Sequence, residues 1–298
     1  MVKMQRWKSK LQVRGVIMKK VVKFGGSSLA NAEQFQKVGD IIRSDESRRY
    51  VVPSAPGKRF DDDIKVTDML YGCYDAASKG EDITEKINAI KARYYEIIKG
   101  LGLSLSLEEE FKKIDEDFRA QAGIQYAASR GEFLNGKIMA AYLGYDFVDA
   151  ASVIRFDKAG NLEAEETNKL LSKKLSKSQH AVIPGFYGAC ADGTVKTFSR
   201  GGSDVTGSLV AKAIHADIYE NWTDVSGFLV TDPRIVHNPE PIEAITYREL
   251  RELSYMGATV LHEDAIFPVR KEGIPINIRN TNSPEDKGTL IVESTCKK

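Results

Sequence analysis

Short runs of β-branched residues alternate with helical stretches along the chain from Lys20 onward. This alternation is typical of a layered α/β fold with a largely parallel sheet. Most of the runs end in Gly, Pro, Ser, Asn or Asp, and ligand-binding loops are expected at the carboxyl ends of parallel strands. We expect strands at Val21 to Phe24, Tyr50 to Val52, Asp146 to Asp149, Ala181 to Ile183, Asp217 to Trp222, Ile274 to Ile278 and Thr289 to Val292.

The pattern turns helical between Asp75 and Gly144. Apolar residues there recur every three to four positions, as they do from Ile83 to Ile98 and again from Leu107 to Phe118. We therefore expect a helical excursion from the sheet around residues 75–144. Such apolar stripes are typical of core packing, so no cofactor is assigned to them.

Charge and length limit the classes of partner. The 298 residues suffice for a sizeable core, and 43 basic against 42 acidic side chains leave a formal charge of +1. That balance gives no bulk charge to hold a nucleic-acid backbone or an anionic membrane surface. No apolar run approaches the roughly 20 residues of a membrane helix. We expect small-molecule substrates, and neither nucleic acid nor membrane as a partner.

The cysteines and the first residues suggest a compartment and a domain boundary. The cysteines Cys73, Cys190 and Cys296 lie far apart without a CxxC pair, which indicates a reducing cytoplasm rather than a zinc site or a disulfide framework. Residues 1–17 are basic and end just before Met18, so we expect a leader or disordered extension rather than a targeting arm. No Pro/Ser-rich linker divides residues 18–298, which favours one bilobed domain.

The first segment that suggests a binding site runs from Val21 to Ser28 and reads VVKFGGSS. A strand there delivers Lys23 and two glycines to the start of an expected helix. Glycines let backbone N–H groups approach a polyanion, and the helix start and the lysine add positive charge, so the segment can cradle phosphate. The P-loop spacing is absent, and a plain strand-to-helix turn explains the segment about equally well.

The second segment, Ser199 to Asp204, reads SRGGSD. Arg200 can bind a carboxylate or phosphate through two hydrogen bonds, and Asp204 can orient Lys23 or a metal. An N-cap at Ser203 and an acidic first-turn residue at Asp204 would explain those two without a ligand. They would not explain Arg200 or the two glycines.

Two further segments carry less information by themselves. Asn221 to Gly227 is followed by TDPR, and in this polar loop Arg234 can reach a nucleotide phosphate while the backbone of Thr223 and Asp224 can meet an adenine. Ser129 to Glu132 has the Ser-x-x-Glu pattern of a capping box, which predicts that a helix begins there.

In this order and at these separations, the four segments resemble the aspartokinase branch of the amino-acid kinase family. The resemblance also includes GFYG before RGGSD, and it runs from Met18 to about Val292. It implies a three-layer α/β/α sandwich with a substrate lobe over residues 18–195 and a nucleotide lobe over residues 196–298. It further implies transfer of the γ-phosphoryl group of ATP to the side-chain carboxylate of L-aspartate, which gives 4-phospho-L-aspartate for lysine, threonine and methionine biosynthesis.

The resemblance also implies roles for single residues. Lys23 neutralises charge on the transferred phosphoryl group, and Asp204 organises the donors around it. Glu132 receives the α-ammonium of aspartate and Arg200 its α-carboxylate. The other residues assigned to the substrate are Thr67, Phe186 and Ser203. Those assigned to the nucleotide, besides Lys23, are Gly25, Gly26, Ser27, Gly201, Gly202, Thr223, Asp224 and Arg234.

Mg²⁺ is expected to accompany ATP, held by phosphates and water without dedicated protein ligands. A homodimer is left open. Three features depart from the family. Thr259 stands where many aspartokinases have a lysine, the loop from Ser54 to Val66 is unusually charged, and no C-terminal ACT regulatory domain is expected after the last strand.

Two rival hypotheses remain at this stage. Glutamate, acetylglutamate, carbamate or uridylate kinases of the same family would share the glycine segments, although Glu132 together with Arg200 favours a free amino acid. A non-catalytic amino-acid or nucleotide sensor would keep the fold without turnover, although Lys23 and Asp204 argue against it.

Overall fold

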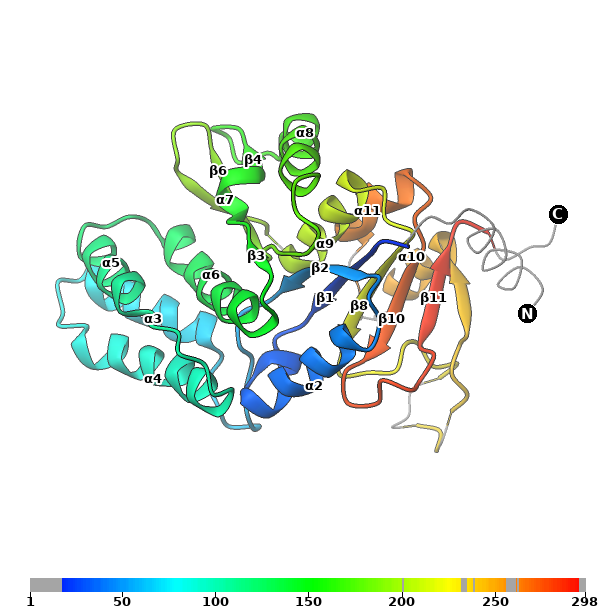
Figure 1. Ribbon diagram of the computed structural model, residues 1–298, viewed down its shortest axis with the longest axis horizontal. Helices are drawn as coiled ribbons and strands as arrows, with labels where there is room; N and C mark the ends of the chain where they lie inside the picture. Colours follow the sequence, from blue (N-terminus) through cyan, green and yellow to red (C-terminus); the bar gives the residue numbers. More distant parts are fainter. Residues whose placement is uncertain are drawn as a thin grey trace.

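The computed structural model describes residues 18–199, 201–231, 235–237, 239–255, 261 and 263–294. Within them, eight strands form one sheet in the order β3-β5-β2-β1-β8-β10-β11-β9 (Figure 1). Neighbouring strands are parallel except for β10 and β11. The largely parallel sheet is therefore confirmed. Its strands are β1 (Lys20–Phe24), β2 (Arg48–Pro53), β3 (Asp146–Phe147), β5 (Ala181–Val182), β8 (Ile218–Thr223), β9 (Ala244–Thr246), β10 (Ile276–Asn280) and β11 (Thr289–Val292).

All seven expected strands are present, and their ends differ by a few residues. β3 stops at Phe147 because the carboxylate of Asp149 accepts the Ala151 N–H and so begins helix α7 (Ala150–Val153). β9 and a small second sheet are not predicted by the sequence patterns. That sheet comprises β4 (Arg155–Phe156), β6 (Tyr187–Cys190) and β7 (Val195–Thr197). Strands of two to four residues are too short to show the alternation that marks a strand.

Helices cover both faces of the large sheet. One group comprises α2 (Ala32–Arg43), α3 (Val66–Ser78), α4 (Thr84–Gly100), α5 (Glu108–Arg119) and α6 (Ile124–Leu143), and a one-turn helix, η1 (Ser27–Leu29), precedes α2. The other comprises α7, α8 (Ala164–Leu175), α9 (Gly202–Ala213), α10 (Tyr247–Tyr255) and α11 (Glu263–Lys271). Figure 1 shows α3 to α5 beyond the sheet, where they pack against α2 and α6. The expected helical excursion is confirmed.

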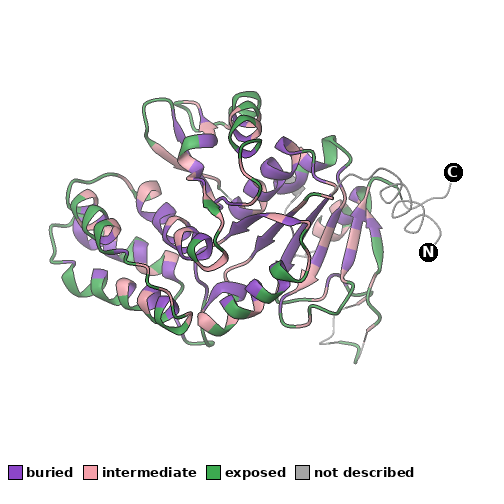
Figure 2. Ribbon diagram, in the orientation of Figure 1, coloured by how far each residue is buried: buried purple, intermediate pink, exposed green. Residues whose placement is uncertain are grey.

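Alternation along β1 explains the three layers. Successive strand residues point to opposite faces. Val21 belongs to a core cluster with residues of α8 to α11, whereas Val22 belongs to a second cluster with residues of α2 to α6. Both valines are fully buried, and Figure 2 shows the central strands buried between helices whose outer sides are exposed. The α/β/α sandwich is confirmed.

A buried ion network holds β1, β2 and β8 together. The Glu220 carboxylate lies 2.8 Å from Nε of Arg48 and 3.0 Å from Nζ of Lys20, and it accepts the Trp222 indole N–H at 2.9 Å. Burial opposes ionisation of Glu220, but Arg48 and Lys20 outweigh it and hold the pKa of this carboxyl below its usual value. The three strands are thereby fixed by charge as well as by backbone hydrogen bonds.

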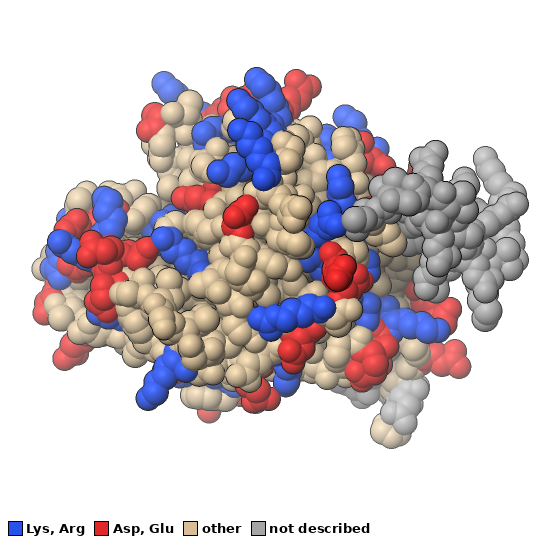
Figure 3. All heavy atoms as spheres, viewed as in Figure 1, with Lys and Arg blue, Asp and Glu red and all other residues tan. Residues whose placement is uncertain are grey.

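The surface in Figure 3 shows basic and acidic side chains interspersed over that face of the molecule. This distribution agrees with the near-zero formal charge. Among the described residues, no helix is long and apolar enough to cross a membrane.

Candidate active site

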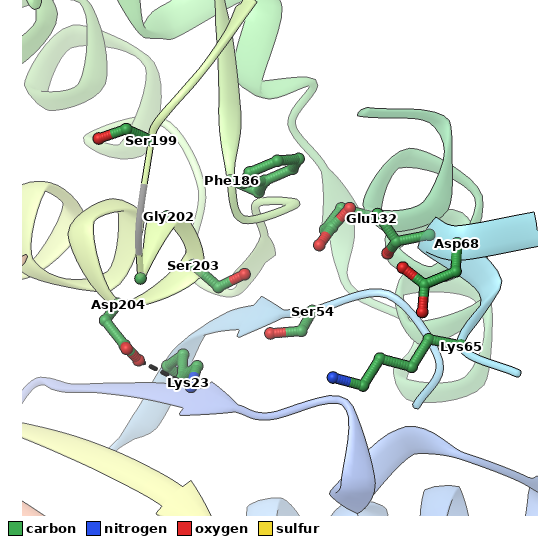
Figure 4. A pocket seen from close by; sticks show the side chains of 12 residues that line it. Lys23, Ser54, Lys65, Asp68, Glu132, Phe186, Ser199, Gly202, Ser203 and Asp204 are labelled. Carbon is green, nitrogen blue, oxygen red and sulfur yellow. Dashed lines mark ion pairs between the residues drawn. The ribbon is translucent and has the colours of Figure 1, made fainter. Parts of the chain in front are cut away.

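A pocket of about 370 Å³ opens at the carboxyl ends of β1 and β2, between these strands and the helices α3, α6 and α9 (Figure 4). This is the edge of the sheet at which parallel strands carry ligand loops. The pocket is lined by Lys23, Ser54, Lys65, Thr67, Asp68, Glu132, Phe186, Ser199, Gly201, Gly202, Ser203 and Asp204.

Lys23 and Asp204 form an ion pair at one end of the pocket. Nζ of Lys23 lies 2.7 Å from Oδ1 of Asp204. The amide of Asn221, on β8, joins both, because its Nδ2 donates to Asp204 at 2.9 Å and its Oδ1 accepts from Lys23 at 3.4 Å. Asp204 lies in the first turn of α9, where a negative charge is also favoured by the helix dipole. The lysine is thus held in one orientation by two elements of the fold.

Close packing and one hydroxyl fix the start of α9. The N-cap residue is Gly201, with φ 54°, and not Ser203, so the simple capping explanation of Ser203 is wrong. The Thr206 hydroxyl accepts the Phe186 N–H at 3.1 Å and donates to the Gly202 carbonyl at 3.0 Å. A Cβ atom at Gly202 would lie 2.6 Å from the Phe186 ring. Only glycine permits this approach, which explains one glycine of the pair.

Phe186 adopts a backbone conformation that is unusual for its residue type. Its φ is 79°, a region that costs a non-glycine residue about 1 kcal/mol or more. Its carbonyl accepts the Phe198 N–H at 3.0 Å, and its own N–H is held by Thr206. The conformation places the ring in the pocket wall (Figure 4).

Glu132 lies inside the 20-residue helix α6, which begins at Ile124. The predicted capping box at Ser129 is therefore wrong: the Ser129 hydroxyl donates to the Tyr126 carbonyl within the helix. Glu132 lines the pocket although the residue is only 6% exposed, and its Oε2 has no hydrogen-bond partner. Burial raises the pKa of the Glu132 carboxyl to about 8, and a backbone hydrogen bond at Ala55 lowers it only in part. The unpaired Oε2 of this buried acid can accept a hydrogen bond from a cation in the pocket.

The remaining wall comes from the start of α3 and the loop before it. Thr67 and Asp68 lie in the first turn of α3, and Lys65 is its N-cap residue. The charged loop is firmly held, because Asp63 pairs with Arg59 at 2.9 Å and with the buried Arg93 at 3.1 Å. These two arginines keep the pKa of the Asp63 carboxyl well below its usual range.

Eight of the predicted residues therefore line one pocket: Lys23, Thr67, Glu132, Phe186, Gly201, Gly202, Ser203 and Asp204. Gly25, Gly26 and Ser27 follow β1 but do not line the pocket. Gly26 packs against the backbone of Gly57 instead. β8 ends at Thr223 and the exposed Asp224 follows it, and neither residue lines the pocket. Arg200, Arg234 and Thr259 lie outside the described residues.

Sequence reasoning missed four lining residues, namely Ser54, Lys65, Asp68 and Ser199, and it missed the amide of Asn221. Two of them flank Thr67 in the segment KVTD, so the signal was adjacent to a residue already assigned. Asn221 opens the NWTDVSG segment, and its inward direction follows from the alternation of side chains along β8.

Fold, pocket and sequence together define the class. The chain belongs to the amino acid kinase family, whose family model matches residues 18–280. It is 40% identical over 289 residues to aspartokinase 3 of Bacillus subtilis. The aspartate kinase structure from Clostridium acetobutylicum superposes with a TM-score of 0.90 at 52% identity. Aspartokinase III of Escherichia coli, solved with aspartate and ADP, superposes with a TM-score of 0.80 at 28% identity.

These matches cover nearly all of this chain and only part of each relative. They span 92% of this chain for the Bacillus protein and 94% for both solved structures. The chain in turn spans 63% of the Bacillus protein, 64% of the Clostridium chain and 65% of the E. coli chain. It therefore corresponds to less than two thirds of the length of these relatives.

Proposed function

We propose that the chain is an aspartate kinase that transfers the γ-phosphoryl group of MgATP to the β-carboxylate of L-aspartate. The observation that carries the proposal is that one pocket holds a carboxyl group that can bind an ammonium and an ammonium that can bind an anion. Glu132 supplies a buried acid whose Oε2 has no hydrogen-bond partner, and Lys23 supplies an ammonium held by Asp204. An amino acid with a second carboxylate can meet both at once. The likeness to aspartokinases supports this choice of substrate.

Glu132 receives the α-ammonium of the substrate in this proposal. With a pKa raised to about 8, Glu132 is largely protonated at neutral pH before an amino acid binds. An arriving ammonium favours the ionised form, so binding of the amino acid is coupled to loss of the carboxyl proton. A substrate with a blocked amine has no ammonium to pair with Glu132, so it cannot offset the free-energy cost of ionising this buried carboxyl group. Arg200, outside the described residues, remains our proposed partner for the α-carboxylate.

Lys23 lies where the phosphoryl group is transferred. A β-carboxylate oxygen forms a bond to the γ-phosphorus while the bond to the bridging oxygen breaks, and ADP leaves with that electron pair. An ionised carboxylate is already a nucleophile, so no general base is required and no covalent enzyme intermediate forms. The enzyme contributes position and charge, which are the main sources of catalysis in phosphoryl transfer. Asp204 and Asn221 fix the direction of the Lys23 ammonium.

The nucleotide is proposed to lie along the carboxyl ends of β1 and β8, next to Lys23. Gly25, Gly26, Ser27, Gly201 and Gly202 remain proposed phosphate donors, and Thr223, Asp224 and Arg234 proposed nucleoside contacts. Mg²⁺ is proposed to arrive with ATP. Among the described residues no group of three or more His, Cys, Asp or Glu side chains converges as a metal site, and Mg²⁺ seldom needs such a cage.

A substrate panel tests the proposal. The chain is incubated with MgATP and each candidate substrate, and ADP release is measured in a coupled assay; the acyl phosphate formed from L-aspartate is also trapped with hydroxylamine as the coloured hydroxamate. We expect aspartate to be phosphorylated, and L-glutamate, N-acetyl-L-aspartate, N-acetyl-L-glutamate, carbamate and UMP to react at least about 100-fold more slowly, since one extra methylene costs on the order of this factor and unpaired polar groups cost more. A faster reaction with N-acetylated acids or UMP contradicts the proposal. Binding of aspartate without turnover contradicts it as well and indicates a sensor.

A further inference from the structure

Lys65 is a second cation in the pocket, and it comes from a different element than Lys23. Among the described lining residues, only these two carry a positive charge. Figure 4 shows the Lys65 side chain reaching into the pocket from the start of α3, toward Ser54 and Lys23. Within the described part of the chain its Nζ makes neither a hydrogen bond nor an ion pair, and this includes Asp68, which lines the same wall. Its charge is therefore available to a ligand.

Local folding does not explain a lysine at this position. Lys65 is the N-cap residue of α3 and makes no side-chain capping bond. A positive charge there opposes the helix dipole, and Ser, Thr, Asp or Asn would stabilise the helix start. A residue that conflicts with its local structure without a compensating contact points to a functional role.

The backbone next to Lys65 is anchored so that its side chain starts from a fixed point. The buried Arg93 guanidinium donates to the Ile64 carbonyl at 3.1 Å and to the Gly57 carbonyl at 3.0 Å. On the other side Val66 is fully buried, and its N–H donates to the Pro56 carbonyl at 3.3 Å. The backbone on both sides of Lys65 is thus held by hydrogen bonds, and the exposed Lys65 side chain extends from it into the pocket.

We infer that Lys65 is a further catalytic residue, whose ammonium binds the phosphoryl oxygens during transfer from the side opposite Lys23. This inference rests on the proposed function. During transfer, negative charge is spread over three equatorial phosphoryl oxygens while an anionic carboxylate approaches. The Lys23 ammonium already contacts Asp204 and Asn221, so fewer of its N–H groups remain for the phosphoryl oxygens. A second, unpaired ammonium across the pocket supplies the charge that Lys23 alone does not.

The test compares three variants in the hydroxamate assay. Lys65→Met keeps the length of the side chain and removes the charge, and Lys65→Arg keeps the charge. Lys58→Met is the matched control, because Lys58 lies in the same loop but its Nζ donates to the Asp61 carbonyl at 2.8 Å and does not line the pocket. We expect Lys65→Met to lower kcat about 100-fold, the usual effect of losing one transition-state donor, with the KM for aspartate within threefold. Lys65→Arg should retain more than a tenth of kcat, and Lys58→Met nearly all of it.

Binding measurements separate this role from a structural one. MgADP with aluminium fluoride imitates the phosphoryl group in transit, so Lys65→Met should weaken its binding in the presence of aspartate by about the same factor as kcat. Binding of MgADP alone should change little. Wild-type activity with aspartate together with an unchanged kcat in Lys65→Met overturns the inference alone, as does a loss confined to the KM for aspartate. A wild-type chain without aspartate kinase activity instead overturns the proposed function, and the inference with it.

Discussion

The ammonium of Lys23 and the carboxylate of Asp204 lie 2.7 Å apart, which joins the end of β1 to the first turn of α9. The contact is nearly buried, with side-chain exposures of 11% and 13%, so solvent screens it weakly. The pair prepares the pocket before any substrate arrives, because the lysine is already oriented. It also means that the positive charge offered to a phosphate is partly balanced by Asp204, and this is why the second described cation of the pocket, Lys65, matters.

Replacing Lys23 by Met should lower kcat by about 10² to 10³, because the variant loses an ammonium directed at transition-state charge. The KM for aspartate should change only a few-fold, since Glu132 lies elsewhere in the pocket. Steady-state kinetics in the hydroxamate assay measures both constants. Lys19→Met, at an exposed lysine just before β1, is the matched control and should behave as wild type. A Lys23→Met enzyme within a few-fold of wild type would show that the phosphate role is wrong.

Aspartate binding should release a proton. The pKa of Glu132 is raised to about 8 by burial, so near pH 7 the free protein holds Glu132 mostly protonated, and pairing with an ammonium ionises it. Calorimetry in buffers of different ionisation enthalpy counts this proton. We expect a release approaching one proton near pH 7 and close to none near pH 9, where Glu132 is already ionised. Glu132→Gln should abolish the release, and an equal release from that variant would contradict the assignment.

The same raised pKa makes a prediction about stability. The folded pKa of Glu132, about 8, lies above its unfolded value of about 4.3. Its contribution to stability is therefore complete below about pH 4 and is lost as the pH rises through about 8. Because Gln does not titrate, Glu132→Gln should gain thermal stability over wild type as the pH rises from about 5 to 8, by roughly 3 °C or more.

The control for this stability measurement is the ligand. Saturating aspartate should raise the Tm of wild type, since binding to the folded state stabilises it, and should affect Glu132→Gln much less. A Tm difference between the two proteins that does not change with pH would exclude a buried, unpaired acid at this position.

Gly185 tests the packing beneath the pocket. A Cβ atom there would lie 2.5 Å from Oγ, 2.6 Å from Cβ and 2.8 Å from Cα of Ser203. The Ser203 backbone belongs to α9, so it cannot shift away from the added Cβ atom without displacing the adjacent Asp204. Gly185→Ala should therefore lower kcat/KM for aspartate about 100-fold, the effect of a displacement of about 1 Å in a catalytic group.

Gly72→Ala is the matched control. Gly72 lies inside α3 with nothing within 4 Å of the added Cβ, and alanine favours a helix over glycine by about 1 kcal/mol. That variant should keep full activity and a Tm equal to or above that of wild type. Equal kinetics of Gly185→Ala and wild type would mean that α9 tolerates a shift at its first turn.

The sequence could predict those parts of the fold that have local signatures. The expected strands at Val21 to Phe24 and Tyr50 to Val52 are short β-branched runs, and the apolar residues of α4 and α5 recur every three to four positions. The glycine segments occur at strand ends or helix starts. The second sheet could not be predicted, because strands of two to four residues are too short to show a recognisable alternation of apolar and polar side chains. The helix start at Ser129 was wrong because a local capping pattern occurs inside a long helix, where tertiary packing decides.

The candidate site was less accessible to sequence reasoning for a different reason. Glu132 is informative through its burial, and that burial depends on residues distant in the chain, such as Ala55, which packs against Gly131. Lys65 resembles any loop lysine until α3 and the Arg93 anchor place it in the pocket. Long-range packing, rather than residue type, distinguishes such residues from ordinary surface charges.

The ion network around Glu220 should make a large contribution to stability. Glu220→Gln removes the charge that Arg48 and Lys20 share in a site only 1% exposed, and unpairing a buried charge costs about 3 to 5 kcal/mol. We expect a Tm lower by at least about 6 °C. Glu33→Gln, in an exposed pair with Lys37, is the control and should leave the Tm nearly unchanged.

The Glu220 network should also make stability depend on pH. Since the pKa of Glu220 is held below its usual value, its contribution to the free energy of unfolding is present above about pH 4.3 and is lost on further acidification. The Tm gap between wild type and Glu220→Gln should therefore narrow below about pH 4, and a gap that widens there would contradict an ionised Glu220 in the folded protein.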